Sequence, residues 1–294
     1  MVTYGDANKV KIVFFSGTGG TARVADIFQK SLEAKGKIVI KHELNSRNKI
    51  INDLEDLLII IFAVHACNAP EPVYEYIDSI PKVDNKLAVV ISVSGGGEIT
   101  PNTACRLHCI KRLEKRGFNV IYEKMLIMPS NWIVPTINDL SVRLLEVLPN
   151  KIEKIINDLS SGVILRTKSN LLNKFLSYIG EFEKIGARHF GKKIKAKQNC
   201  NGCGWCEKAC PRANITLVNG APTFNNNCLL CLKCIYGCPQ GALEPGVGKF
   251  IVIKQGYNLN VIEKNTSEDK LDSVESLAKG YLWKGVKEYL LNDN

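Results

Sequence analysis

Two cysteine runs near the C-terminal end constrain this chain more than any other feature of its sequence. The stretch C-N-G-C-G-W-C-E-K-A-C-P covers residues 200–211, and its cysteine spacing returns as C-L-L-C-L-K-C-I-Y-G-C-P at 228–239. Each run therefore follows the pattern C-x2-C-x2-C-x3-C-P. Three thiolates at this spacing can surround one face of a cubane iron–sulfur cluster, while the fourth cysteine points away and ligates the other cluster. The runs thus predict two [4Fe-4S] clusters with crossed ligation.

Crossed ligation divides the cysteines of the two runs into two sets of four. Set 1, the predicted ligands of one cluster, is Cys200, Cys203, Cys206 and Cys238. Set 2, the predicted ligands of the other, is Cys228, Cys231, Cys234 and Cys210. Zinc is the alternative, because C-x2-C pairs also suit tetrahedral zinc, but zinc ribbons need two pairs rather than three closely spaced cysteines and a fourth before proline. The segment resembles the bacterial two-cluster ferredoxin over about fifty residues.

The cysteine count and the lengths of the apolar runs indicate the cellular compartment in which the protein is expected. Eleven cysteines are an odd number, and no secretory leader precedes them, so a disulfide framework is not expected and the compartment is reducing. The longest apolar run, residues 57–66, is far shorter than the roughly 20 residues that span a bilayer. We therefore expect a cytoplasmic protein without a transmembrane segment, and an apolar fraction of 45% suffices for a well-packed core.

Apolar runs alternate with segments of helical periodicity over the first 160 residues. The strands are expected at 10–15, 37–44, 57–64, 87–93 and 119–127. The helices are expected at 21–35, 71–80, 102–116 and 139–159, the last with a break near Pro149. Strands that alternate with helices in this way form a parallel sheet covered on both faces by right-handed crossovers. The predicted fold class is therefore α/β, a doubly wound parallel sheet.

A glycine-rich loop follows the first predicted strand and opens the first predicted helix. Free backbone N–H groups and the positive end of a helix favour an anion at such a place, and hydroxyl groups can complete a phosphate site without a cationic side chain. The pattern is neither a P-loop nor the dinucleotide motif G-x-G-x-x-G. The predicted phosphate-binding residues are Ser16, Gly17, Thr18, Gly19, Gly20 and Thr21.

The sequence S-G-T-G-G-T at 16–21 resembles the FMN-phosphate loop of flavodoxins, and the alternating strands match that fold. The resemblance implies sheet order 2-1-3-4-5 and an FMN ring held by the loops after the third and fourth strands. Neither loop, 63–72 or 92–102, contains an aromatic residue, so one face of the ring is expected to be open unless Trp132 reaches it. The ring-binding residues implied by the resemblance are Val64, His65, Ala66, Ser94, Gly95, Gly96 and Gly97.

The sequence divides into four segments. A flavodoxin-like FMN-binding domain is expected at 1–162, a basic linker helix at 163–196, a small α+β two-cluster ferredoxin-like domain at 197–246, and a strand-and-helix tail at 247–294. Within 163–199 there are nine Lys or Arg against two Asp or Glu, although the whole chain carries a net charge of only +10. Because no nucleic-acid module is recognisable, this basic surface is expected to attract an acidic protein, such as a ferredoxin or flavodoxin, unless it is simply a solvated helix face.

The joined architecture resembles the EFR family ferrodoxins, which are fusions of a flavodoxin-like and a ferredoxin domain. The resemblance implies an electron-transfer flavoprotein that passes electrons between FMN, two [4Fe-4S] clusters and a redox partner protein. An FMN-dependent reductase of a small organic acceptor, quinone-like or nitro, is the alternative. A sheet that has lost FMN and only positions the ferredoxin-like part is a third interpretation, which the intact S-G-T-G-G-T sequence disfavours.

Overall fold

A parallel sheet forms the centre of the computed structural model, which describes residues 4–48, 55–180, 182–264 and 272–292. Its strands are β1 (Lys9–Phe15), β2 (Ile38–Glu43), β3 (Leu57–Ala63), β4 (Lys86–Ser94) and β5 (Phe118–Ile127). They are arranged in the order β2-β1-β3-β4-β5, and every neighbouring pair is parallel. This order defines the flavodoxin-like fold and confirms the predicted fold class.

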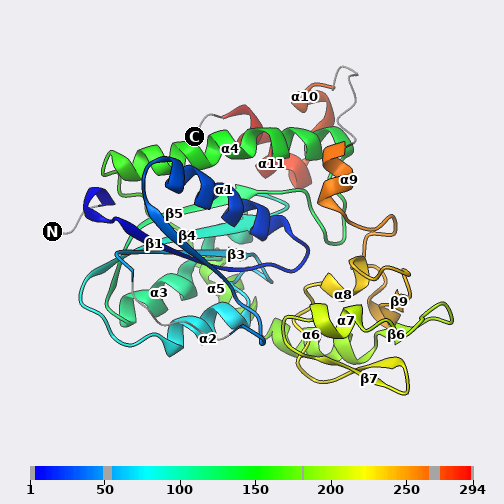
Figure 1. Ribbon diagram of the computed structural model, residues 1–294. Helices are drawn as coiled ribbons and strands as arrows, with labels where there is room; N and C mark the ends of the chain where they lie inside the picture. The colour runs from blue at the N-terminus through cyan, green and yellow to red at the C-terminus, as the bar shows by residue number, and fades with distance from the viewer. Residues whose placement is uncertain (1–3, 49–54, 181, 265–271, 293–294) are drawn as a thin grey trace.

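Helices cover both faces of the sheet (Figure 1). One face packs against α1 (Gly20–Ala34) and α4 (Asn138–Ser160), and the other against α2 (Glu71–Ser79) and α3 (Leu107–Lys115). Successive residues of β1 enter the two cores alternately, which explains why the central strands are apolar throughout. A short 3₁₀ turn (Asn102–Ala104) precedes α3, so the helix expected at 102–116 has two parts. Another 3₁₀ turn, Tyr4–Asp6, precedes β1.

The expected break in the fourth helix is wrong, because α4 continues through Pro149 from Asn138 to Ser160. A proline inside a helix removes one backbone hydrogen bond and costs about 3 kcal/mol. Leu144 and Leu148 before the proline and Ile152 and Ile156 after it are nonetheless all buried in the same layer. Burial of this stripe on both sides of the proline outweighs the local cost and keeps the helix in one piece.

The basic linker begins as part of the sheet domain. Leu165 forms a parallel bridge with Tyr122 at the edge of β5, with backbone bonds of 3.0 and 2.9 Å on its two sides. The chain then forms α5 (Leu171–Gly180) and α6 (Glu183–Lys192), so the linker helix expected within 163–196 is two helices. These helices lead from the sheet to the cysteine-rich segment, which lies to the lower right in Figure 1.

The cysteine-rich segment is built from short elements. They are β6 (Lys195–Ala196), α7 (Trp205–Ala209), β7 (Ile215–Val218), β8 (Ala221–Phe224), α8 (Lys233–Tyr236) and β9 (Leu243–Glu244). Strands β7 and β8 form an antiparallel hairpin between the two runs, and β6 pairs with β9. The second strand pair joins the beginning of the segment to its end, which makes it a closed α+β unit.

The C-terminal tail returns to the sheet domain. The strand expected in residues 249–257 is wrong: after a 3₁₀ turn (Gly246–Gly248) these residues form successive turns, in which the Ile253 N–H donates to the Tyr236 hydroxyl at 2.8 Å. Helices α9 (Leu259–Lys264), α10 (Val274–Leu277) and α11 (Tyr281–Leu291) then lie beside α4, whereas residues 265–271 of the tail are outside the described residues. Within the described ranges, no helix is long and apolar enough to cross a membrane.

Candidate functional site

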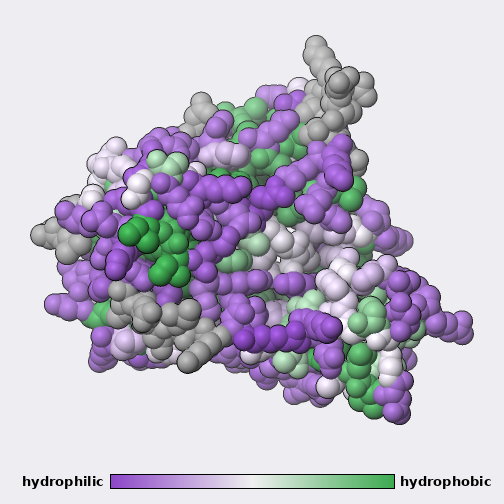
Figure 2. Space-filling view, in the orientation of Figure 1, coloured by the Kyte–Doolittle hydropathy of each residue, from purple (hydrophilic) through white to green (hydrophobic). Residues whose placement is uncertain are grey.

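A cleft of about 360 Å³ lies at the carboxyl edge of the sheet, where the loops after β1, β3, β4 and β5 meet. Its volume falls within the range of about 300–1,000 Å³ that is usual for small-molecule and cofactor sites. In an open parallel sheet, this edge beside the switch between β1 and β3 is where ligands bind. In Figure 2 pale, near-neutral side chains occupy the region between the start of α1 and α8.

The predicted phosphate loop forms one wall of the cleft. Ser16, Gly17, Thr18, Gly20 and Thr21 line it, while Gly19 lies on a neighbouring surface hollow and ends the loop with a φ of 98° before α1. The Ser16 hydroxyl accepts a hydrogen bond from the Ala22 N–H at 3.2 Å, and the Thr18 hydroxyl accepts one from Asn131 Nδ2 at 2.7 Å. Because both hydroxyls act as acceptors in these bonds, each can still donate its own proton to an anion. The loop therefore suits a phosphate group.

The loops after β3 and β4 form the opposite wall. Val64, His65 and Ala66 line the cleft after β3, and Ser94, Gly95 and Gly96 line it after β4. At Gly95 an added Cβ would be only 2.7 Å from the Ser130 Cβ, so this position has no room for a side chain. The structure therefore brings together all but two of the thirteen residues predicted to hold FMN, the exceptions being Gly19 and Gly97.

Gly97 belongs to a contact with the C-terminal tail. Its φ is +88°, and an added Cβ would be 2.8 Å from the Gly285 backbone of α11. A Cβ added to Gly285 would in turn lie 2.4 Å from the Gly96 carbonyl oxygen. The pair of glycines thus allows α11 to touch the loop after β4, a packing role that sequence spacing alone could not distinguish from ring binding.

Two aromatic residues outside the predicted loops line the cleft. Trp132, from the loop after β5, is 40% exposed, and Tyr257 comes from the tail, where its hydroxyl donates to the Pro129 carbonyl at 2.9 Å. Burial raises the pKa of Tyr257, so its hydroxyl stays protonated at physiological pH. The aromatic side chains missing from the loops at 63–72 and 92–102 are therefore supplied by other segments, and no local signal around Tyr257 marks it for this place.

The second cysteine run forms part of the cleft wall. Leu230, Cys231 and Leu232 line the cleft together with the phosphate loop. The approach is tight, because a Cβ added to Gly17 would be 2.5 Å from the Cys231 carbonyl oxygen and 3.0 Å from its Cβ. One cysteine of set 2 is thus in van der Waals range of the predicted phosphate site, a juxtaposition of residues more than 200 positions apart that the sequence did not indicate.

His65 connects the loop after β3 with the same run. Its ring lies edge-on to Phe15, with centroids 6.0 Å apart. Burial lowers the pKa of His65 to about 4, and a hydrogen bond with the Leu229 backbone opposes this shift. The imidazole is therefore neutral at physiological pH, and it serves as a polar contact between the cleft and the cysteine-rich segment.

The cysteines gather in two separate cavities. Cys200, Cys203, Cys206 and Cys238 line one, and Cys210, Cys228, Cys231 and Cys234 line the other. The cysteines that line the two cavities are the same as those of sets 1 and 2, which crossed ligation predicts. Ligation of clusters by these cysteines stays a prediction. Among the described residues, no three His, Cys, Asp or Glu side chains are grouped so that they could hold one metal ion.

Ionisation of these thiols needs compensating charge. Burial raises the pKa of Cys231 to about 12, with smaller contributions from Cys228 and Cys210. Burial also raises the pKa of Cys206, and the neighbouring Cys238 and Cys200 raise it by smaller amounts. Thiolates that are unfavourable by themselves become favourable when iron shares the site, so the donor set fits an iron–sulfur core.

The two runs follow the same backbone path. The left-handed conformation occurs at Gly202 and Gly204 in the first run, and Leu230 and Leu232 adopt it at the same positions in the second, with φ of 56° and 60°. The fourth cysteine of each run accepts a backbone N–H four residues later, Asn214 to Cys210 and Ala242 to Cys238, both at 3.3 Å. A strained conformation in two leucines is retained only where the surroundings fix it, which is common at functional sites.

Contacts outside the cleft fix the cysteine-rich segment to the sheet domain. Arg212 pairs with Glu75 through both guanidinium nitrogens, at 2.5 and 2.9 Å. The Ser46 N–H donates to the Pro211 carbonyl at 2.7 Å, and the Tyr236 hydroxyl donates to the Asn131 carbonyl at 2.9 Å. These contacts join the cysteine-rich segment to α2 and to the loops after β2 and β5.

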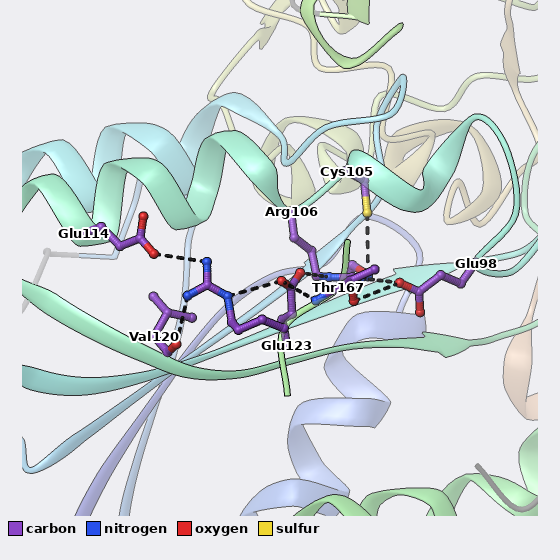
Figure 3. A network of polar contacts seen from close by, with 9 residues as sticks. Glu98, Cys105, Arg106, Glu114, Val120, Glu123 and Thr167 are labelled. Carbon is purple, nitrogen blue, oxygen red and sulfur yellow. Dashed lines mark hydrogen bonds and ion pairs between the residues drawn. The ribbon is translucent and has the colours of Figure 1, made fainter. Parts of the chain in front are cut away.

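A buried polar network supports the loop after β4 (Figure 3). Arg106 is 1% exposed, pairs with Glu98 and with Glu123 (2.7 Å), and also donates to Ser92 and Thr167. Burial by itself lowers the pKa of Arg106, but Cys105, Glu98 and Glu123 raise it above its ordinary value, so the guanidinium remains charged. The network ties the cleft loop to β5 and to the start of the linker. The charged sequence around Arg106 gave no indication that it is buried.

Three thiols lie outside the two runs. Cys105 and Cys109 are fully buried, and burial raises the pKa of Cys105 to about 11. These two residues are therefore small side chains of the core. Cys67 instead lines the cleft, with a φ of 64°.

Fold and site together define a flavodoxin-like sheet joined to an iron–sulfur segment. Residues 199–243 match the family described as 4Fe-4S dicluster domain, which supports a 4Fe-4S centre in this segment. No curated protein has a similar sequence by the comparison made.

Several solved structures resemble the sheet domain in shape. A flavodoxin of Streptococcus pneumoniae TIGR4 is 18% identical, with 53% of this chain and 99% of that chain covered and a TM-score of 0.40. Flavodoxin 2 of Bacillus cereus is 17% identical, with 52% and 98% covered and a TM-score of 0.37. A flavo di-iron protein of Thermotoga maritima is 19% identical, with 52% and 35% covered and a TM-score of 0.37. The fold assignment depends on the strand order and not on these similarities.

Proposed function

We propose that this chain is an electron-transfer flavoprotein that holds FMN in the cleft and a [4Fe-4S] cluster on each cysteine set. The single observation that carries the proposal is the position of Cys231, which lines both the cleft and the cavity of set 2. A cofactor in the cleft and a cluster on set 2 would share one wall. FMN, when bound, exchanges one or two electrons, whereas a cluster exchanges one.

The residues of the cleft have distinct roles in this proposal. The Ser16 and Thr18 hydroxyls and the first N–H groups of α1 bind the phosphate. The loops after β3 and β4 enclose the ring, with Gly95 keeping the wall close to the loop after β5. Trp132 and Tyr257 supply apolar surface that reduces contact with water. The neutral His65 adds no charge beside the ring.

The two cysteine sets would act in sequence. Set 2 lies at the cleft, whereas set 1 includes Cys203, an exposed cysteine, and lies beside the exposed Lys195 and Lys197 of β6 and its continuation. Lys197 Nζ donates to the Gly241 carbonyl at 3.2 Å, three residues after Cys238. An acidic redox partner, such as a ferredoxin or flavodoxin, would therefore dock at set 1, where complementary charge accelerates encounter.

Two single cysteine substitutions test the order of the centres. Cys231→Ala removes a ligand of set 2, and Cys203→Ala removes the corresponding ligand of set 1. After photoreduction of the bound flavin in anaerobic protein, fast bleaching of cluster absorbance is expected in wild type and Cys203→Ala but not in Cys231→Ala. Equal transfer in the two variants would contradict the proposed order.

A reductase of a small organic acceptor is the second candidate, favoured by the exposure of Trp132 at the cleft. Steady turnover of a quinone or nitro compound with reduced ferredoxin as donor would assign this activity. Protein-to-protein electron exchange without turnover in such a screen would assign the carrier function.

A further inference from the structure

Helix α5 has the opposite polarity to an ordinary surface helix. Its buried side chains are polar: Asn173 is 2% exposed and Ser177 is fully buried. Ser177 Oγ donates to Asn68 Oδ1 at 2.7 Å, and Asn173 Nδ2 donates to Thr100 Oγ1 at 3.4 Å. These bonds fix α5 to the loops after β3 and β4, which form the cleft. Helices at a protein surface normally bury an apolar face and expose a polar one.

The outer face of α5 and its continuation into α6 is apolar. The side chains with their exposed fractions are Leu171 83%, Leu172 57%, Phe175 61%, Tyr178 49%, Ile179 50%, Phe182 67% and Ile185 63%. Positions 171, 175 and 178 are spaced by four and three residues and therefore share one face of α5, and positions 182 and 185 continue this spacing into the start of α6. We call these seven residues the α5–α6 stripe. Exposed apolar side chains are common singly, but a contiguous stripe marks an interaction surface.

The stripe lies within the most basic part of the chain. Residues 163–199 contain nine Lys or Arg and two Asp or Glu. Lys168, Lys184, Lys192 and Lys193 are exposed, and Lys174 is half-exposed. The surface that would cover the stripe must therefore be apolar in its centre and negatively charged around it.

These two requirements, an apolar centre and a negatively charged surround, distinguish between three possible binding partners of the stripe. A second copy of the chain would bring the same basic flanks face to face across a two-fold axis, which is electrostatically unfavourable. A transient redox encounter is steered mainly by charge and buries little surface, whereas the stripe presents seven side chains that are each 49% to 83% exposed. An anionic bilayer meets both requirements, because its acyl region takes Phe, Leu and Ile while its headgroups attract lysine.

We propose that the α5–α6 stripe binds the protein to the surface of an anionic lipid bilayer, with α5 and α6 lying in the plane of the interface. Each helix has ten residues, about half of what a bilayer crossing needs, so the contact is peripheral. Through the bonds of Asn173 and Ser177, the loops of the cleft would then lie directly behind the membrane-contacting helix. This proposal does not depend on the identity of the cofactor in the cleft.

Flotation of the full-length, cofactor-loaded protein with lipid vesicles tests the proposal. Wild type is expected to float with vesicles containing phosphatidylglycerol, to bind vesicles of phosphatidylcholine alone much more weakly, and to lose affinity as salt rises. Phe175→Ser combined with Phe182→Ser should weaken binding by roughly tenfold or more for each substitution. Lys174→Glu and Lys184→Glu should each weaken it roughly fivefold at low salt.

The matched control is Phe250→Ser, since Phe250 is also exposed, at 71%, but lies outside the stripe. Iron and flavin contents equal to wild type would establish that each variant is folded. Failure of wild type to float with anionic vesicles would overturn the proposal, as would equal binding by wild type and the double phenylalanine variant. A stripe-dependent dimer in sedimentation velocity without vesicle binding would assign the stripe to a second copy instead.

Discussion

Gly17 is the position where a minimal substitution most directly probes the contact between the cleft and the second cysteine run. An alanine Cβ there would be 2.5 Å from the Cys231 carbonyl oxygen, whereas ordinary contact begins near 3.4 Å. The nearest atoms are backbone atoms and the Cβ of Cys231, so no flexible side-chain end can move aside to relieve the contact. Overpacking of this kind costs about 1–3 kcal/mol. Gly17→Ala should therefore lower the free energy of unfolding by that amount.

Gly20→Ala is the matched control from the same loop. Its Cβ would meet Met128 Cβ at 3.8 Å, which is ordinary contact, and Gly20 already has a helical conformation as the first residue of α1. A glycine replaced by alanine at a compatible helical site stabilises a protein by about 0.4–1 kcal/mol. The two variants should thus shift stability in opposite directions, although both retain every backbone N–H of the loop.

Urea unfolding of anaerobic protein, followed by flavin fluorescence and by cluster absorbance, measures both effects. Gly17→Ala should also slow electron exchange between the flavin and the cluster on set 2, because the two loops must separate. If both variants had wild-type stability and exchange rates, the phosphate loop and the Cys231 loop would not be in contact, and the proposed route would lose its basis.

Three further predictions each compare two substitutions. Arg106→Met removes the closer of the two guanidinium groups that pair with Glu123, which is only 5% exposed, and leaves the more exposed Arg166 at 3.4 Å. It should cost about 3 kcal/mol in urea unfolding, whereas Arg112→Met, at an exposed pair with Asp78, should cost less than about 1 kcal/mol. Similar losses in the two variants would contradict the buried network. Gly191→Ala would place a Cβ 2.3 Å from the Cys228 Cβ and should reduce the iron content of the protein. Its control is Gly186→Ala, whose Cβ would lie in open space and should leave the iron content unchanged. Unchanged iron content in both variants would refute the close approach of α6 to Cys228. Cys210→Ala and Cys238→Ala should each remove the cluster of the opposite run, as judged by iron and sulfide content and by electron paramagnetic resonance, and loss confined to the residue's own run would overturn crossed ligation.

The sequence predicted the sheet because its signals are local. Each central strand is a short apolar run bounded by turn residues, and glycine ends α1 and α3. The strand order, in contrast, was implied by the resemblance of S-G-T-G-G-T at 16–21 to the flavodoxin phosphate loop. The two cysteine sets were also predictable, since a fixed spacing carries the chemistry. The predictions at Pro149 and at residues 249–257 were wrong because tertiary packing overrode local preference at both places.

The composition of the cleft was only partly accessible from sequence. The phosphate loop and the loops after β3 and β4 are continuous motifs, and nearly all of their predicted residues line the cleft. Leu230 and Tyr257 reach it from distant segments, and no spacing rule connects them with the sheet. Arg106 was missed for a different reason, because a charged residue in a helix is normally exposed and its buried partners lie on other elements. Contacts of this kind exist only after the chain has folded.

The proposed electron-transfer function requires that flavin and both clusters occur together on one chain. Iron, sulfide and flavin should be counted on a single anaerobically purified sample whose visible spectrum is recorded at the same time. The account predicts one FMN per chain together with iron and sulfide for two cubane clusters. Iron and sulfide for two clusters without flavin would contradict it, because the cleft would then be only a scaffold for the iron–sulfur segment.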